Sequence, residues 1–217
     1  MCFLSGMSYE FEATSIIYAG DPLCSWCWGM AQELQRLGEI CDFPFHLVLG
    51  GLRPGTTQEL QDEEREHIKH HWLEVTRRTG QPITFDLLEN KVPFIYDTEV
   101  PCRAVVTVRG IDPQKSFPFF KAVQRGFYVE NRDTNEIAFY EPLLAALSID
   151  VDQFRERFYS EEVKKETNDD FMWCRQVGVH SFPTVILYDN DQLYALAIGY
   201  ATYHELIARM KGIMQKD

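Results

Sequence analysis

The sequence predicts an α/β fold in which a long helical block interrupts a small sheet domain. Short runs of strong β-formers occur near residues 16–19, 43–49 and 185–198, and they almost vanish between residues 53 and 170. Within that middle block the apolar residues recur at helical spacing. We therefore expect a sheet domain made of residues 14–52 and 171–217, and a helical insertion made of residues 53–170.

The first segment has the pattern strand, helix, strand. The run from Ile16 to Ala19 precedes a helix that carries Cys27, Ala31 and Leu34 on one face. A second strand follows over residues 43–49. Because strands joined through a helix lie parallel with a right-handed crossover, the sheet is expected to begin with a parallel pair.

The middle block contains five expected helices. The first is long, polar and amphipathic, with Ile68, Trp72 and Val75 on its apolar side, and Pro101 suits the first turn of the second. Glu141-Pro142 is expected to open the fourth, because proline is tolerated at a helix start. The five helices cover residues 58–78, 101–109, 115–128, 143–147 and 151–159.

The last segment returns to the sheet through a helix, a hairpin and a final helix. Gly178 is expected to end the first of these helices, since glycine favours the C-terminal cap. Thr202 and Glu205 have the spacing of a capping box for the last helix. The elements cover residues 170–177, 185–188, 193–198 and 203–214, with a hairpin turn at residues 189–191.

Two cysteines stand where the first strand passes into the first helix. Cys24 and Cys27 are spaced i and i+3, so both sulfurs lie on one side of the first turn, near enough to form a disulfide. The free N–H groups and the helix dipole at this end stabilise a thiolate at Cys24. Cys27 falls one turn deeper on the apolar face, where burial disfavours its charge. An attacking thiol beside a resolving thiol is what thiol–disulfide exchange needs.

Structural roles for this pair are less well supported. A zinc site needs four ligands, and a disulfide across two residues constrains little of the chain. His67, His70 and His71 have a chelating spacing, but no carboxylate accompanies them in the zincin arrangement, so we interpret them as surface histidines. We expect redox use of the pair and no metal site. The other cysteines are scattered singly: Cys2, Cys41, Cys102 and Cys174.

Charge and composition narrow the class of partner. The formal net charge of −12 disfavours binding to nucleic acids and to anionic membrane surfaces, because like charges repel. No apolar run approaches the length of a membrane span, and the first residues lack the basic region of a signal peptide. We therefore expect a cytoplasmic protein, where isolated thiols stay reduced and a C-x-x-C pair is more often catalytic than structural.

Four stretches resemble one family of oxidoreductases. Residues 21–29, 50–55, 102–106 and 178–184 are similar to the DsbA family, specifically to its FrnE-like branch. The resemblance implies a thioredoxin-like fold interrupted by a helical insertion, and thiol–disulfide oxidoreductase or isomerase activity without a metal. It also implies that Cys24 is the nucleophile, Cys27 the resolving thiol and Pro183 a cis-proline that faces them.

Further residues are expected to contact the substrate. Ser25 and Trp26 lie between the cysteines, and the backbone of Phe182 would pair with an extended substrate, as in strand addition. His180 lies on the loop expected to face the thiols, where an imidazolium would help to hold Cys24 as thiolate. An exposed loop histidine without that role is an equally good interpretation.

Two positions depart from the family pattern. Thioredoxin and the periplasmic DsbA carry a buried carboxylate six residues before the first cysteine, and here that position is Tyr18. Asp21 is nearer in sequence, but its charge opposes thiolate formation at Cys24. We interpret Asp21 as a turn or helix-entry residue before Pro22, and we do not carry the redox potential over from these relatives.

The sequence thus predicts a thiol–disulfide oxidoreductase or isomerase that acts on disulfide-containing proteins or peptides, or on a small thiol. No cofactor is expected, apart from glutathione as a co-substrate. One alternative is a glutathione-dependent isomerase or a kappa-like glutathione transferase, which share this fold but use a serine in the active-site segment. Another is a redox-sensing or client-binding protein. The oligomeric state stays open.

Overall fold

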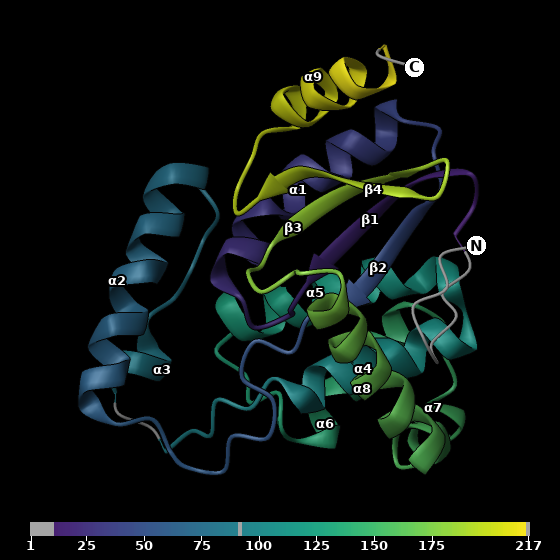
Figure 1. Ribbon diagram of the computed structural model, residues 1–217. Coiled ribbons are helices and arrows are strands. Elements are labelled where there is room, and N and C mark those ends of the chain that lie inside the picture. Colours follow the sequence, from purple (N-terminus) through teal and green to yellow (C-terminus); the bar gives the residue numbers. More distant parts are fainter. Residues whose placement is uncertain (1–10, 91–92, 216–217) are drawn as a thin grey trace.

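A four-stranded sheet forms the centre of the protein (Figure 1). The computed structural model describes residues 11–90 and 93–215. The strands lie in the order β2-β1-β3-β4, with β1 parallel to β2 and antiparallel to β3, and β3 antiparallel to β4. Their bounds are β1 Thr14–Gly20, β2 Phe45–Leu49, β3 Thr184–Asp189 and β4 Gln192–Ile198.

Alternate residues of β1 point into two different cores. Ile16 and Tyr18 belong to the core shared with α1 (Ser25–Ile40) and α9 (Tyr203–Met214). Ile17 and Ala19 belong to the core on the other face, which α8 (Glu161–Gln176) covers. Because both faces of the sheet are covered, β1 is an almost continuous run of buried residues.

The helices between β2 and β3 form two groups. The larger group, α4 to α7, packs with α8 around the main core. The other group, α2 and α3, shares a second apolar core with Leu23 and Trp28 at the start of α1, and Figure 1 shows these two helices standing beside the rest of the molecule. The bounds are α2 Asp62–Thr79, α3 Asp86–Glu89, α4 Glu99–Ile111, α5 Ser116–Tyr128, α6 Ile137–Ala146 and α7 Val151–Phe158, with a 3₁₀ turn at Pro113–Lys115.

Several local signals are confirmed. The capping box of α9 is present: Thr202 N–H donates to Glu205 over 2.8 Å, and Glu205 N–H donates to the Thr202 hydroxyl over 3.3 Å. Gly178 has a φ of +79° just after α8. Asn190 and Asp191 form the predicted hairpin turn, with φ values of +47° and +63°.

Three predicted helix starts are wrong. α2 begins at Asp62 rather than at residue 58, because Gln61 and Glu64 form a capping box there. α6 begins at Ile137 rather than at residue 143 and contains Pro142, because the buried rings of Phe139 and Tyr140 anchor its first turn. α8 begins at Glu161 rather than at residue 170, because the Ser160 hydroxyl accepts from the Val163 N–H over 3.2 Å.

The predicted boundary at residue 170 therefore falls inside α8. The bounds of the sheet domain and of the insertion remain predictions. The short helix α3 was not predicted, since four residues carry too little periodicity.

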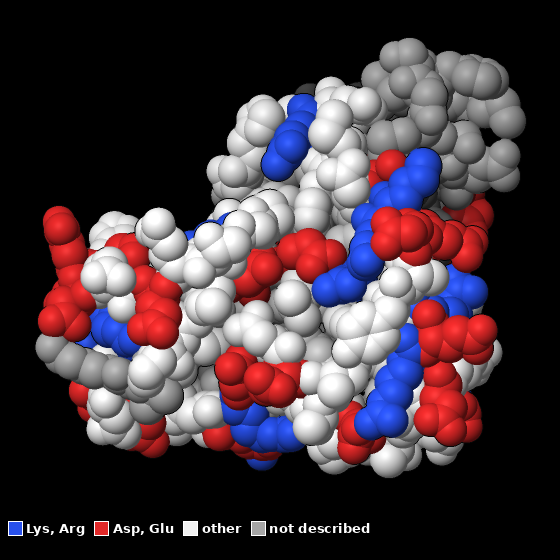
Figure 2. All heavy atoms as spheres, turned by 90° about the horizontal axis from the view of Figure 1, so that it is seen from below, with Lys and Arg blue, Asp and Glu red and all other residues white. Residues whose placement is uncertain are grey.

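One face of the protein is mixed in charge. Figure 2 shows acidic and basic side chains interspersed over the face drawn there, rather than gathered into one basic field. Within the described ranges, 11–90 and 93–215, every helix is too short or too polar to cross a membrane.

Candidate active site

The two thiols lie at the amino-terminal end of α1. Cys24 is the residue just before the helix, its backbone is extended (φ −83°, ψ 116°), and its side chain does not cap the first turn. The N–H groups of that turn are therefore available to a charge on the Cys24 sulfur. Both Cys24 and Cys27 are free thiols.

The two thiols differ in burial and in partners. Cys24 is 5% exposed, and its S–H donates to the carbonyl oxygen of Phe182 over 3.4 Å. Cys27 is 0% exposed. Burial raises the pKa of Cys27 well above its usual value, and the adjacent Cys24 raises it further. Both thiols are therefore largely buried, but Cys24 keeps a small exposed area and a contact with the Phe182 carbonyl, whereas Cys27 is fully enclosed and stays protonated.

The loop before β3 meets the thiols through Phe182. The peptide bond between Phe182 and Pro183 is cis, as predicted. The Phe182 ring lies on Gly50, where an added Cβ would come within 2.1 Å of it, so glycine is required at that position. Gly50 N–H donates to the Gly20 carbonyl over 2.8 Å. The ends of β1 and β2 and the loop before β3 are therefore held together at the thiols.

Asp21 ties the start of α1 to the loop that follows β2. Its buried carboxylate accepts from the N–H groups of Leu23 and Leu52, at 2.9 and 2.7 Å, and the Cys102 thiol donates to it over 3.5 Å. Burial raises the pKa of Asp21 to about 6, although the donors at Leu52 and Leu23 oppose that shift. The predicted turn role is confirmed. The contacts with Leu52 and Cys102 were not predicted, because they join residues far apart in sequence.

Two tyrosines of the middle block hold the residue before Cys24. The hydroxyls of Tyr96 and Tyr128 both donate to the Leu23 carbonyl, at 2.5 and 2.6 Å. Trp28 stacks on Tyr128 with an interplanar angle of 9°. Sequence reasoning missed both tyrosines, because their partner is a backbone atom and leaves no pattern.

The other residues predicted to contact substrate have different surroundings. Trp26 is half-buried, with its ring 6.4 Å from that of Tyr200, and Arg78 lies 5.4 Å above the Tyr200 ring. Ser25 is largely buried at the start of α1. His180 is exposed and makes no hydrogen bond or ion pair with the part of the chain that the structure describes. The substrate-contacting roles of these residues stay predictions.

The histidines of α2 are exposed, as predicted. The Nε2 atoms of His67 and His71 lie 3.2 Å apart. Among the described residues, no group of three or more His, Cys, Asp or Glu side chains is arranged to hold a metal ion.

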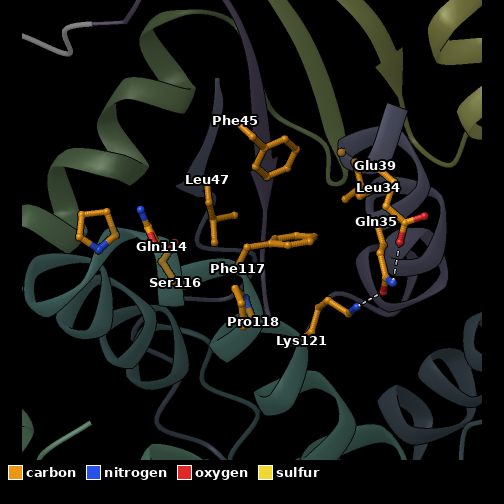
Figure 3. A pocket seen from close by; sticks show the side chains of 12 residues that line it. Leu34, Gln35, Glu39, Phe45, Leu47, Gln114, Ser116, Phe117, Pro118 and Lys121 are labelled. Atoms are coloured by element: carbon orange, nitrogen blue, oxygen red, sulfur yellow. Dashed lines mark hydrogen bonds between the residues drawn. The ribbon is translucent and has the colours of Figure 1, made fainter. Parts of the chain in front are cut away.

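A cavity of about 620 Å³ lies at the other end of α1 (Figure 3). Leu34 of α1, Leu47 and Phe45 of β2 and Phe117 of α5 form its apolar wall. At the rim, Lys121 donates to the Gln35 side chain over 2.5 Å. No cysteine lines this cavity, so it is separate from the thiol site.

A family comparison agrees with this geometry. The thioredoxin family model matches residues 18–207, from β1 into α9. The chain belongs to the thioredoxin family. Cys24, Cys27 and the cis peptide bond between Phe182 and Pro183 all lie within the matched region.

Similar proteins extend the comparison. The crystal structure of "a putative protein disulfide isomerase" from Nitrosomonas europaea is 36% identical, with a TM-score of 0.85, over 94% of this chain and 99% of that chain. The cytosolic disulfide reductase DsbM from Pseudomonas aeruginosa is 23% identical, with a TM-score of 0.77, over 94% of this chain and 100% of that chain. Its structure with GSH gives a TM-score of 0.73. The ClpXP adapter protein SpxH from Bacillus licheniformis is 19% identical over 200 residues, which are 88% of this chain and 65% of that protein.

These matches confirm the predicted resemblance to the DsbA family and the thioredoxin-like fold with a helical insertion. The fold and the adjacent thiols are those of a DsbA-type thiol–disulfide oxidoreductase. The narrower FrnE-like assignment stays a prediction.

Proposed function

We propose that this protein exchanges its Cys24–Cys27 dithiol with the disulfides of proteins, peptides or a small thiol such as glutathione. The main supporting observation is the position of Cys24. It lies at the amino-terminal end of α1 and against the Phe182 carbonyl, with the buried Cys27 next to it. The structural matches described as "a putative protein disulfide isomerase" and "cytosolic disulfide reductase DsbM" support the same chemistry.

In the reductive direction the reaction has two displacements. The Cys24 thiolate attacks one sulfur of a disulfide R–S–S–R′, so that a Cys24–S–S–R bond forms and R′–S⁻ leaves and takes up a proton. Cys27 then loses its proton and attacks the Cys24 sulfur, so that the Cys24–Cys27 disulfide forms and R–SH leaves. The substrate gains two electrons and two protons, and the protein loses them.

The residues around Cys24 suit a peptide or small disulfide substrate. The Phe182 carbonyl accepts from Cys24 only while that thiol keeps its proton, so in the mixed disulfide it is free to accept from a substrate N–H. Trp26 and Leu52, which is 43% exposed, supply apolar contact area beside the site. Ser25 and His180 complete the proposed substrate contacts.

The proposed setting is the cytoplasm, with reduction or isomerisation as the outcome. The cytosolic disulfide reductase DsbM shares the fold, which supports this setting. The reduction potential of the Cys24–Cys27 pair tests this. A value near roughly −270 mV, as in thioredoxin, supports reduction, and one near about −120 mV, as in DsbA, supports oxidation instead.

Insulin reduction by dithiothreitol tests the function itself. The wild-type protein should accelerate it in a catalytic amount, and Cys24→Ser should abolish the acceleration. Full activity of Cys24→Ser would overturn the proposal.

The second candidate, a glutathione-dependent isomerase or kappa-like transferase, is supported by the fold shared with a structure that contains GSH. It predicts that the protein conjugates glutathione to an electrophilic aromatic substrate and that Cys24→Ser retains this activity. We rank it second because both cysteines are present in the active-site segment.

A further inference from the structure

A buried tyrosine hydroxyl stands beside the resolving thiol without a formed hydrogen bond. Tyr18 of β1 is 0% exposed, and its hydroxyl has no hydrogen-bond partner of good geometry within residues 11–90 and 93–215. An unpaired buried hydroxyl is destabilising, and native structures keep few of them. The Cys27 thiol is within its reach, since a side-chain interaction of poor geometry between the two groups adds to the burial that raises the pKa of Tyr18 and opposes the burial that raises the pKa of Cys27.

The surroundings hold this side chain in one place. The Tyr18 ring packs against Phe45, Phe117 and Phe120, with centroid distances of 6.2, 6.3 and 5.9 Å. Phe45 and Phe117 also line the cavity in Figure 3, and Tyr18 is not among the residues that line it. A Cβ on Gly20 would lie 2.8 Å from the Tyr18 hydroxyl. Glycine at position 20 therefore leaves room for the hydroxyl at the end of β1 where the thiols lie.

The Cys27 thiol lies in the same core cluster as Tyr18, and it is the side chain with which this hydroxyl interacts. The Tyr18 hydroxyl and the Asp21 backbone N–H both lower the pKa of Cys27, against the stronger effect of burial. Burial raises the pKa of Tyr18 itself well above its usual value, so the phenol keeps its proton. Tyr18 can therefore donate a hydrogen bond to Cys27 but cannot remove a proton from it.

We propose that the Tyr18 hydroxyl donates a hydrogen bond to the Cys27 sulfur as that sulfur becomes a thiolate, and so speeds the release of substrate from Cys24. The inference rests on the proposed thiol–disulfide exchange. The Cys27–Cys24 bond forms, the Cys24–S–S–R bond breaks, and the proton from Cys27 goes to the solvent or to the leaving thiol. A donor that is unpaired beside the thiol and paired with the thiolate lowers the barrier of that step alone.

The experiment separates the two displacements with a chromogenic disulfide. Reduced protein mixed with dithiobis(nitrobenzoate) releases one thionitrobenzoate when Cys24 attacks and a second when Cys27 resolves. In Tyr18→Phe the first release should keep its rate. The second release should slow about tenfold or more, because losing a hydrogen bond to a charged group reduces a rate by about that factor. The pH midpoint of the second release should rise by about one unit.

Three controls make the outcome specific. Cys24→Ser and Cys27→Ala assign the two releases and separate them from the reaction of the half-exposed Cys41. Tyr140→Phe removes another buried hydroxyl, which donates to the Thr134 carbonyl over 2.6 Å, and should leave the second release unchanged.

A purely structural Tyr18 predicts that Tyr18→Phe alters only the melting temperature. An unchanged rate and pH profile of the second release would therefore overturn the inference. A wild-type protein that shows no second release would refute the proposed exchange function instead.

Discussion

Cys24 and Cys27 carry the same side chain, but they differ in burial and in hydrogen-bond partners because they lie one helical turn apart. Cys24 precedes α1, where backbone N–H groups lack partners, and its thiol reaches the Phe182 carbonyl. Cys27 sits in the main core, where burial raises its pKa. The attacking and the resolving roles that we propose follow from these two environments.

Alkylation should distinguish the two thiols. With iodoacetamide at mildly acidic pH, we expect Cys24 to be labelled well before Cys27, since Cys24 keeps 5% of its surface exposed at the helix start, whereas Cys27 is 0% exposed and its pKa is raised. Peptide mass spectrometry measures the order. In Cys27→Ala, mixed disulfides should accumulate through Cys24, because the second displacement is lost. Equal labelling of both thiols would contradict this assignment.

Asp21 should make stability depend on pH. Its pKa is raised from 3.8 to about 6 in the folded protein, so the native state binds the proton more tightly than the unfolded state. Stability from this group is therefore full below the unfolded pKa and falls as pH rises through about 6, by up to about 3 kcal/mol.

Urea unfolding of wild type and Asp21→Asn at several pH values tests this. The wild type should lose that stability relative to the variant between about pH 4 and pH 7. Both proteins carry the same other carboxyl groups, so the contribution of those groups to the pH dependence of stability cancels in the comparison. Parallel pH profiles for the two proteins would show that Asp21 does not titrate in this way.

At the scale of elements, the site is where the ends of β1 and β2, the start of α1 and the loop before β3 converge. Gly50 and Gly20 allow this approach: one lies under the Phe182 ring and the other beside Tyr18. The contact between the Phe182 carbonyl and Cys24 depends on the first of them.

Gly50→Ala should therefore impair the site without removing a thiol. The new methyl group would lie 2.1 Å from the Phe182 ring, so the loop before β3 must shift. We expect the rate of insulin reduction to fall by about tenfold or more, because a small misplacement of reacting groups is costly. Alkylation of Cys24 should change little.

Gly212→Ala is the matched control. Gly212 lies in α9 with no atom within 4 Å of an added Cβ, and the change should raise the free energy of unfolding by about 0.5–1 kcal/mol. Unchanged insulin reduction by Gly50→Ala would show that the contact with Phe182 is dispensable.

Local patterns in the sequence predicted the elements that position the thiols. The apolar run of β1, the C-x-x-C at a helix start and the Phe182-Pro183 loop each leave a local mark. The start of α6 escaped prediction, because tertiary burial of Phe139 and Tyr140 overrides the local preference of Pro142.

Contacts between distant residues were beyond the sequence patterns. The hydroxyls of Tyr96 and Tyr128 bind a backbone carbonyl, and the Asp21 carboxylate binds the Leu52 N–H. Such partners are far apart along the chain and have no characteristic spacing. The departure at Tyr18 was visible in the sequence, but its unpaired hydroxyl appears only in the structure.

On the scale of the whole molecule, one ion pair joins the helical block to the edge of the sheet. Arg109 of α4 donates to both carboxylate oxygens of Asp170 in α8, at 2.8 and 2.9 Å. The same groups satisfy the outer edge of β2: Arg109 donates to the Leu47 carbonyl over 3.0 Å, and Asp170 accepts from the Leu49 N–H over 2.8 Å. The open edge strand is thereby covered, and three elements are fixed to one another.

Breaking this pair should destabilise the entire fold. Asp170 is 0% exposed, so Asp170→Ala removes its buried contacts with Arg109 and with the Leu49 N–H. We expect the free energy of unfolding to fall by about 3–5 kcal/mol. Arg109→Ala leaves the buried carboxylate and should cost a similar amount, and the double variant should cost less than the sum. Urea unfolding followed by circular dichroism and by tryptophan fluorescence measures this, and both signals should report one transition.

Lys165→Ala is the matched control. It removes the exposed pair with Asp169 in the same helix and should change the free energy of unfolding by about 0.5 kcal/mol or less. An Asp170→Ala variant as stable as Lys165→Ala would show that the edge of β2 needs no ion pair.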